Sequence, residues 1–174
     1  MLEFDNAYIK IPSLKLKEDE TQALIKCFNE NQHNKYTYYS KRGTDTSLEI
    51  INKVDNPPTI LTRLVNSIPS GYFWDFAFLG NYGSIFPHVD DTRQAVISWP
   101  LIYEGTPTTF INSEDTEVIT DLYYEDNIPA LWNTKFWHKV NKASGFRLFF
   151  QIELHQSNNY QYYYNLYKSK KLFI

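Results

Sequence analysis

The stretch GYFWDFAFLG, residues 71–80, alternates with a period of two residues. Its members divide between two faces, with Phe73, Asp75, Ala77 and Leu79 on one and Tyr72, Trp74, Phe76 and Phe78 on the other. Successive side chains of a β-strand point to opposite sides, so this pattern predicts a strand. Helical patterns precede this stretch and strand patterns follow it, so the predicted secondary structure changes from mainly helix to mainly strand here.

Seven further short strands are predicted after residue 80, about ten residues apart and separated by turn residues. They are SIFPHVD (84–90), QAVISWPLI (94–102), PTTFIN (107–112), TEVITDLYY (116–124), PALWN (129–133), WHKVN (137–141) and FRLFFQIEL (146–154). Regular short strands of this kind are typical of a β-sandwich, jelly roll or barrel.

Two helices are predicted before the strands. Residues 17–32, KEDETQALIKCFNENQ, form an amphipathic pattern, and TILTRLVNSI (59–68) follows two prolines that suit a helix start. Phe4 to Pro12 is predicted to be a short strand. Residues 33–50 are polar around Gly43 and are predicted to be a loop, either a lid over a site or an exposed connection. The expected class is α+β, mainly β, with helices packed on one outer face.

Length and composition limit what the chain could be. Its 174 residues suit one domain, with helical support over 1–70, a β core over 71–154 and a tail over 155–174. A net charge of −3 argues against a protein that coats nucleic acid. The single cysteine, Cys27, excludes a disulfide framework. No targeting segment or membrane-length apolar run is found, which predicts a cytoplasmic protein without a membrane partner.

Three residues in the strand region have the chemistry of a metal site. His88 and Asp90 lie two apart on one predicted strand, so their side chains share a face, and His138 lies near the start of another strand. Two histidines and a carboxylate make the facial triad of non-haem Fe(II) oxygenases, which leaves three coordination positions open. Taken alone, His88 and Asp90 could equally be a hydrogen-bonded surface pair.

Arg147 is predicted to share a strand face with Gln151 and Glu153, while the opposite face of that strand is purely apolar. A guanidinium inside a barrel is costly unless it is paired. Two partners are open at this point: a carboxylate ligand bound through two hydrogen bonds, or a core acid such as Glu153 or Asp121.

The second half of the chain resembles the 2-oxoglutarate and Fe(II)-dependent dioxygenase superfamily. The resemblance covers roughly residues 71–154. It consists of HVD at 88–90, HKV at 138–140 and Arg147 nine residues after His138. LWNTKFWHKVN, residues 131–141, also resembles the "NT…HxVxN" stretch of small bacterial and phage members. The resemblance implies a double-stranded β-helix, or jelly roll, with N-terminal supporting helices.

The resemblance also implies roles for single residues. His88, Asp90 and His138 would hold Fe(II), and Arg147 would bind the distal carboxylate of 2-oxoglutarate, with Tyr82 and Asn133 as further contacts to it. With O₂, such an enzyme converts 2-oxoglutarate to succinate and CO₂ and oxidises a substrate. The expected reaction here is hydroxylation of a protein side chain or a free amino acid, including proline.

Two other classes stay open at this point. One is a non-catalytic or zinc-binding cupin-like module, because His₂Asp with an open position also suits zinc. The other is a structural β-protein of phage or capsid type. Arg147 discriminates against the first, which needs no guanidinium at that spacing, and the extent of helix before the strands argues against the second. The tyrosines of residues 160–164 are expected either in an oligomer contact or packed over an open barrel end, and the pattern does not decide the oligomeric state.

Overall fold

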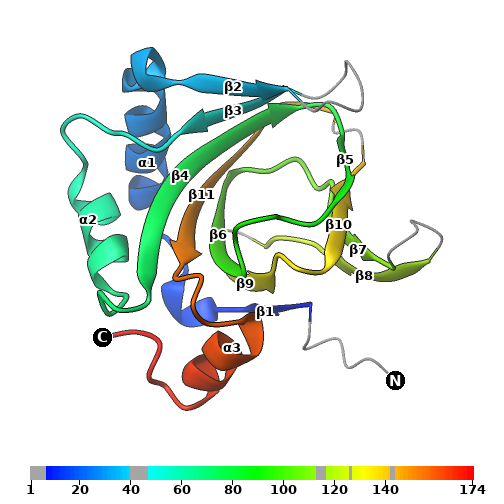
Figure 1. Cartoon of the computed structure of the whole chain (residues 1–174). Coiled ribbons are helices and arrows are strands. Elements are labelled where there is room, and N and C mark those ends of the chain that lie inside the picture. The colour runs from blue at the N-terminus through cyan, green and yellow to red at the C-terminus, as the bar shows by residue number, and fades with distance from the viewer. Residues whose placement is uncertain (1–6, 40–46, 113–116, 126, 142–143) are drawn as a thin grey trace.

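The computed structural model of the chain describes residues 7–39, 47–112, 117–125, 127–141 and 144–174. Two antiparallel β-sheets face each other, and helices cover the outer side of the larger sheet (Figure 1). This arrangement confirms the α+β, mainly β class. None of the helices in the described part of the chain is both long enough and apolar enough to cross a membrane.

The larger sheet has seven strands in the order β1-β9-β6-β11-β4-β3-β2. Their bounds are Tyr8–Lys10 (β1), Ala130–Asn133 (β9), Ala95–Ile102 (β6), Arg147–Leu154 (β11), Phe73–Tyr82 (β4), Ser47–Ile51 (β3) and Tyr36–Tyr39 (β2). The smaller sheet has four strands in the order β5-β10-β7-β8. Their bounds are Ile85–His88 (β5), Trp137–Val140 (β10), Thr108–Ile111 (β7) and Val118–Leu122 (β8). All eight strands predicted from residue 71 onward are therefore present.

The described residues also form three α-helices: α1 (Glu18–Glu30), α2 (Thr59–Asn66) and α3 (Tyr160–Lys168). The first two match the helices predicted from the sequence. Acidic residues fill the first turn of α1, where they suit the partial positive charge of a helix N-terminus. The predicted strand over Phe4 to Pro12 is confirmed at Tyr8–Lys10, and residues 4–6 lie outside the described residues.

The predicted loop over residues 33–50 is wrong for two segments, because β2 and β3 form a hairpin there. Strand β3 pairs with β4, with Ile50 opposite Leu79, and so extends the larger sheet. An ion pair between Lys35 and Glu49 (2.9 Å) ties the two arms of the hairpin together. The polar composition concealed these strands, although Tyr and Thr favour β-structure. Residues 40–46, which include Gly43, lie outside the described residues.

The C-terminal tail contains helix α3, which the sequence did not predict. The side chain of Asn159 caps it by accepting a hydrogen bond from the backbone N–H of Tyr162 (3.0 Å). Tyr160 and Tyr163 are buried among the apolar side chains of the main core, together with Leu172. These two tyrosines therefore pack inside the molecule rather than forming an exposed contact between subunits.

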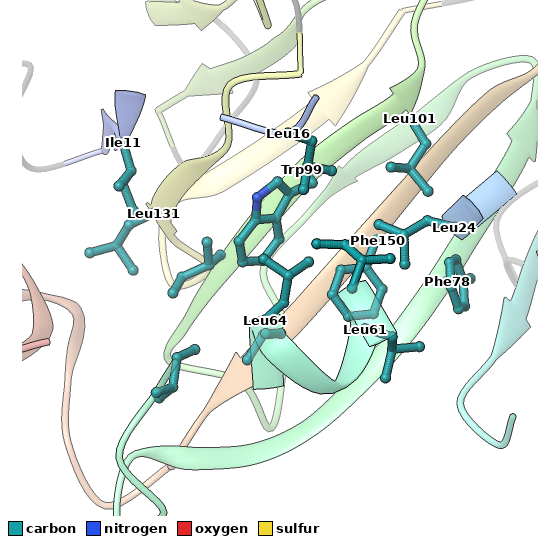
Figure 2. Close-up of a cluster of buried hydrophobic side chains, with 14 of the residues drawn as sticks. Ile11, Leu16, Leu24, Leu61, Leu64, Phe78, Trp99, Leu101, Leu131 and Phe150 are labelled. Carbon is teal, nitrogen blue, oxygen red and sulfur yellow. The ribbon is translucent and has the colours of Figure 1, made fainter. Parts of the chain in front are cut away.

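The main apolar core lies between the larger sheet and the helices (Figure 2). Phe78 of β4, Trp99 of β6 and Phe150 of β11 meet Leu24 of α1 and Leu61 of α2 there. Fully burying an apolar side chain of this size contributes about 1.5–3 kcal/mol to folding. A second, smaller core lies between the two sheets and includes residues from both of them: Val96, Phe110, Leu122, Tyr124, Trp132 and Phe149.

Gly80 of β4 lies where a side chain would collide with the core. A Cβ atom there would come within 2.7 Å of Phe146 Cζ and 3.4 Å of Phe28 Cζ. The Phe146 ring packs against Phe28 and Tyr82, with ring centroids 6.1 and 4.7 Å away, so it has little room to move. We expect Gly80→Ala to lower the free energy of unfolding by about 1–3 kcal/mol in chemical denaturation.

The matched control for this prediction is Gly71→Ala. A Cβ atom at Gly71 would have no neighbour within 4 Å. That variant is expected to be as stable as the native chain or slightly more stable, because alanine restricts the unfolded chain. Equal denaturation midpoints for the two variants would contradict the steric argument.

Candidate metal centre

His88, Asp90 and His138 lie together at one end of the space between the sheets. His88 ends β5 and lies directly opposite His138 of β10, so their rings are 4.2 Å apart between centroids. One ligand atom from each of the three residues lies within 4.8 Å of the other two. The distance from His88 Nε2 to Asp90 Oδ1 is 3.7 Å. The predicted triad is thus brought together by strand pairing and a short loop.

Hydrogen bonds to the backbone fix the tautomer of both histidines. His88 Nδ1 lies 2.8 Å from the carbonyl oxygen of Phe86, and His138 Nδ1 lies 2.9 Å from that of Phe136. A carbonyl oxygen only accepts, so each Nδ1 carries the hydrogen and each Nε2 keeps a free lone pair. This is the usual support for histidines that bind a metal through Nε2.

His138 is held in the neutral form that a metal needs. The side chain is only 4% exposed. Burial and the neighbouring His88 together lower the pKa of His138 to about 4, against an opposing effect of Asp90. At neutral pH the imidazole of His138 therefore carries no proton on Nε2.

This pKa shift predicts a pH dependence of stability for the metal-free protein. An unfolded histidine takes up a proton near pH 6.5, whereas His138 in the folded chain does so only near pH 4. The free energy of unfolding should therefore be highest above pH 6.5 and should fall as the pH drops from 6.5 toward 4. The contribution is about 3 kcal/mol in total.

The measurement is urea denaturation across this pH range in the presence of a chelator. His138→Gln serves as the control, because it removes the group that titrates. Its stability should depend less steeply on pH between 6.5 and 4. Equal slopes for this variant and the native chain would contradict the assignment to His138.

Asp90 is held by the segment that precedes the distal histidine. Its backbone N–H donates to the carbonyl of Thr134 (3.1 Å). The ammonium of Lys135 donates to the carbonyl oxygens of Asp90 (2.6 Å) and Asp91 (2.8 Å). The loop that carries the carboxylate is therefore fixed without any metal. The "NT" of the 131–141 motif lies in this segment, where Thr134 helps to position the carboxylate.

A second arginine, Arg93, forms an ion pair with Asp90, with Nη2 2.8 Å from Oδ2. Arg93 also contacts Gln151 and Glu153 of β11. Burial opposes its charge, but Asp90 and Glu153 outweigh burial and raise the pKa of Arg93 above its ordinary value. Sequence patterns did not single out Arg93, because its partners on β11 lie 58 and 60 residues away along the chain.

A cavity of about 90 Å³ leads from the triad into the space between the sheets. His88, His138 and Arg93 line one part of it, and Arg147 also lines it. The rest of the wall combines polar side chains with apolar ones: Asn81, Ser98, Thr108, Tyr124 and Gln151, with Leu48, Leu79, Ile85, Trp132, Val140 and Phe149. Of these, Phe149 and Gln151 were expected on the Arg147 face of their strand.

Arg147 is 1% exposed, and no carboxylate of the described residues forms an ion pair with it. Its Nε has no hydrogen-bond partner. The guanidinium carbon lies 4.9 Å from the centre of the Phe149 ring and 5.8 Å from that of Tyr103. Burial lowers the pKa of Arg147, yet an arginine in a protein stays charged. The cavity thus contains a cation whose Nε–H has no acceptor among the described residues and could donate to an anionic ligand.

The predicted alternative, in which Arg147 pairs with Glu153 or Asp121, is wrong. Glu153 pairs with Arg93 instead, with Oε1 3.4 Å from Nη1. Asp121 accepts a hydrogen bond from the hydroxyl of Thr109 at 2.6 Å. Both acids are therefore engaged elsewhere.

Tyr82 and Asn133 lie apart from this cavity lining. Tyr82 is 57% exposed and its ring packs against Phe146. Asn133 accepts a hydrogen bond from the backbone N–H of Lys135 (3.0 Å). Their contacts to a cosubstrate stay predictions.

Comparison with known proteins indicates the fold. No protein-family model matches the sequence, and no curated protein matches it. Among solved structures, the α-ketoglutarate-dependent epimerase SnoN from nogalamycin biosynthesis is similar, with a TM-score of 0.63 and 11% identity over 87% of this chain and 78% of SnoN. A Pseudomonas putida prolyl-4-hydroxylase matches with a TM-score of 0.59 and 13% identity, over 87% of this chain and 93% of that one.

A third similar structure is a prolyl hydroxylase from Trichoplax adhaerens in complex with a peptide fragment of hypoxia inducible factor. It has a TM-score of 0.60 and 12% identity, over 87% of this chain and 84% of its own. These likenesses confirm the double-stranded β-helix, or jelly-roll, fold. At such low identity they support the fold alone, so the chemistry must be argued from the side chains.

Proposed function

We propose that this chain is an Fe(II)- and 2-oxoglutarate-dependent oxygenase. The observation that carries the proposal is that one cavity is lined both by the two histidines of a His₂Asp cluster and by a buried arginine that has no ion-pair partner among the described residues. The cluster suits a metal with open positions, and the arginine suits the far carboxylate of a dicarboxylic acid. A metal-binding module without a cosubstrate would have no use for Arg147.

The donor set fits iron. His88 and His138 would bind Fe(II) through Nε2, and Asp90 would bind it through a carboxylate oxygen. Two imidazoles and one carboxylate are the ligands of non-haem Fe(II) oxygenases. Bound together, Fe(II), 2-oxoglutarate and O₂ supply the oxidising chemistry, in which one oxygen atom enters the succinate product and the other enters the substrate.

The residues of the cavity bind and orient the cosubstrate. Arg147 would hold its distal carboxylate by charged hydrogen bonds. Tyr124 lies in the same wall, and burial raises its pKa to about 12, so its hydroxyl keeps its proton and stays a hydrogen-bond donor. The apolar side chains Leu79 and Phe149 leave little room for water beside the carbon chain. Tyr82 and Asn133 remain predicted further contacts.

The proposed reaction is hydroxylation of a protein side chain or a free amino acid, with release of succinate and CO₂. Support for this choice comes from the two prolyl hydroxylases described above, one of them in complex with a peptide fragment. The likeness to SnoN keeps a small-molecule substrate within the proposal. The net charge of −3 disfavours nucleic acid, and a cytoplasmic location stays a prediction.

The alternative is a zinc-binding or non-catalytic cupin-like module. An anaerobic titration of the purified protein with Fe(II) and then 2-oxoglutarate separates the two. The oxygenase should develop a weak visible charge-transfer band that requires both components. If Zn(II) binds but no band appears with Fe(II) and 2-oxoglutarate, the oxygenase proposal fails.

A further inference from the structure

The two oxygens of the Asp90 carboxylate have different neighbours. Oδ2 lies 2.8 Å from Nη2 of Arg93, whereas Oδ1 lies 3.7 Å from Nε2 of His88. A carboxylate oxygen that faces a guanidinium has less lone-pair density left to offer a metal than the other oxygen has. The ion pair therefore leaves Oδ1, the oxygen that lies near His88, as the better donor to a metal.

Arg93 is itself fixed by the larger sheet. Its Nη1 donates to Gln151 Oε1 (3.0 Å) and lies 3.4 Å from Glu153 Oε1, both on β11. Gln151 in turn donates to the hydroxyl of Ser98 on β6 (3.1 Å). The carbonyl of Arg93 accepts a hydrogen bond from the Thr134 hydroxyl (2.7 Å). The guanidinium thus connects the loop that carries Asp90 to two central strands.

We propose that Arg93 is a positioning residue of the metal centre, which holds Oδ2 of Asp90 so that only Oδ1 binds the metal. The inference rests on the proposed function, because it concerns the metal that the triad would hold. Three protein atoms then occupy three positions of an octahedral ion. Two of the remaining positions serve a chelating cosubstrate, and one serves O₂.

Loss of Arg93 would free the second carboxylate oxygen. Asp90 could then chelate the metal through both oxygens and occupy a position that 2-oxoglutarate needs. At the same time, a positive charge beside the metal would be gone, which favours binding of a cation. Arg93 variants should therefore keep the metal and lose affinity for 2-oxoglutarate. If Arg93 only stabilised the fold, its loss would not weaken 2-oxoglutarate binding while leaving metal binding intact.

The test uses Co(II) as the metal probe and 2-oxoglutarate as the second ligand, with the full-length chain. Co(II) affinity, the visible Co(II) spectrum and the dissociation constant of 2-oxoglutarate are measured for each variant. We expect Arg93→Met to bind Co(II) at least as tightly as the native protein. Its affinity for 2-oxoglutarate should fall at least tenfold, with a changed Co(II) spectrum. The affinity of Arg93→Lys for 2-oxoglutarate should lie between those of Arg93→Met and the native protein, because lysine keeps the charge but has a single donor group.

Two further variants keep the comparison sound. Arg93→Met leaves Glu153 without its cation, so the double variant Arg93→Met/Glu153→Gln replaces it if the single one does not fold. Lys35→Met is the matched control, because it breaks a half-buried ion pair with Glu49 on the β2–β3 hairpin. This control should bind both ligands as the native protein does.

The outcomes distinguish this inference from the proposed function. If the native protein binds no Co(II), both fall. If it binds Co(II) and 2-oxoglutarate and the Arg93 variants bind 2-oxoglutarate within twofold of native, the positioning role alone is overturned. A parallel tenfold loss of Co(II) would also overturn it, because Arg93 would then support the whole site rather than one oxygen of Asp90.

Discussion

Replacing His88 with alanine, or Asp90 with asparagine, is expected to abolish tight iron binding while the chain stays folded. Either change leaves only two ligands, and two nitrogen or oxygen ligands hold Fe(II) weakly. Asparagine is preferred at residue 90 because it keeps the size of the side chain and an oxygen next to Arg93, whose Nη2 lies 2.8 Å from Oδ2 of the carboxylate. Iron content after anaerobic loading and desalting measures the effect, and circular dichroism monitors the fold.

His33→Ala is the control for this experiment. His33 also contacts a carboxylate, with Nε2 2.8 Å from Asp55 Oδ2, but it lies on an exposed surface outside the cavity lining. Its loss should leave iron binding unchanged. Unchanged iron content in both His88→Ala and Asp90→Asn would refute the triad.

The second large effect is expected at Arg147. Arg147→Met should weaken 2-oxoglutarate binding about a hundredfold while the metal stays bound. The loss corresponds to about 3 kcal/mol, the scale of a charged hydrogen bond in a buried site. Isothermal titration of the Mn(II)-loaded protein with 2-oxoglutarate measures it.

The same variant should not be less stable than the native chain when no ligand is present. Arg147 is buried and pairs with no acid in the described part of the chain, so its charge costs desolvation energy that methionine does not. The unfolding midpoint of ligand-free Arg147→Met should therefore equal or exceed the native one. A native-like affinity for 2-oxoglutarate in this variant would remove Arg147 from the cosubstrate site.

The parts of the fold that could be predicted were those with strict local patterns. On β11 the alternation between Arg147 and Leu154 correctly separated a core face from a cavity face. The triad was also accessible, because His88 and Asp90 are neighbours on one segment and His138 belongs to a strand with clear bounds. The strand period accounts for β11. For His88 and Asp90 the expected shared strand face is wrong, because β5 ends at His88 and Asp90 lies in the loop that follows, so only their closeness in sequence was informative.

Other features depend on contacts that a single sequence does not display. The Arg93 network joins a loop to residues far along the chain, and nothing near Arg93 marks it. Tyr124 follows the end of β8 and lines the cavity there. The sequence around it has no pattern that distinguishes it from an ordinary strand end. Helix α3 was missed because tyrosines occupy several of its faces, and burial of Tyr160 and Tyr163 distinguishes its inner side only in three dimensions.

The two faces of strand β11 have different roles, one in folding and one in lining the cavity. Leu148, Phe150 and Ile152 pack against the helices, while Arg147 and Gln151 line the cavity. A deletion of one residue would exchange the two sets and destroy both functions together. Point substitutions would separate them: changes on the apolar face would show as poor yield of folded protein, and changes on the other face as well-folded but inactive protein. Along this strand, positions where substitutions impair folding should therefore alternate with positions where they impair only activity. A library of variants screened for both yield of folded protein and activity would show this period of two residues.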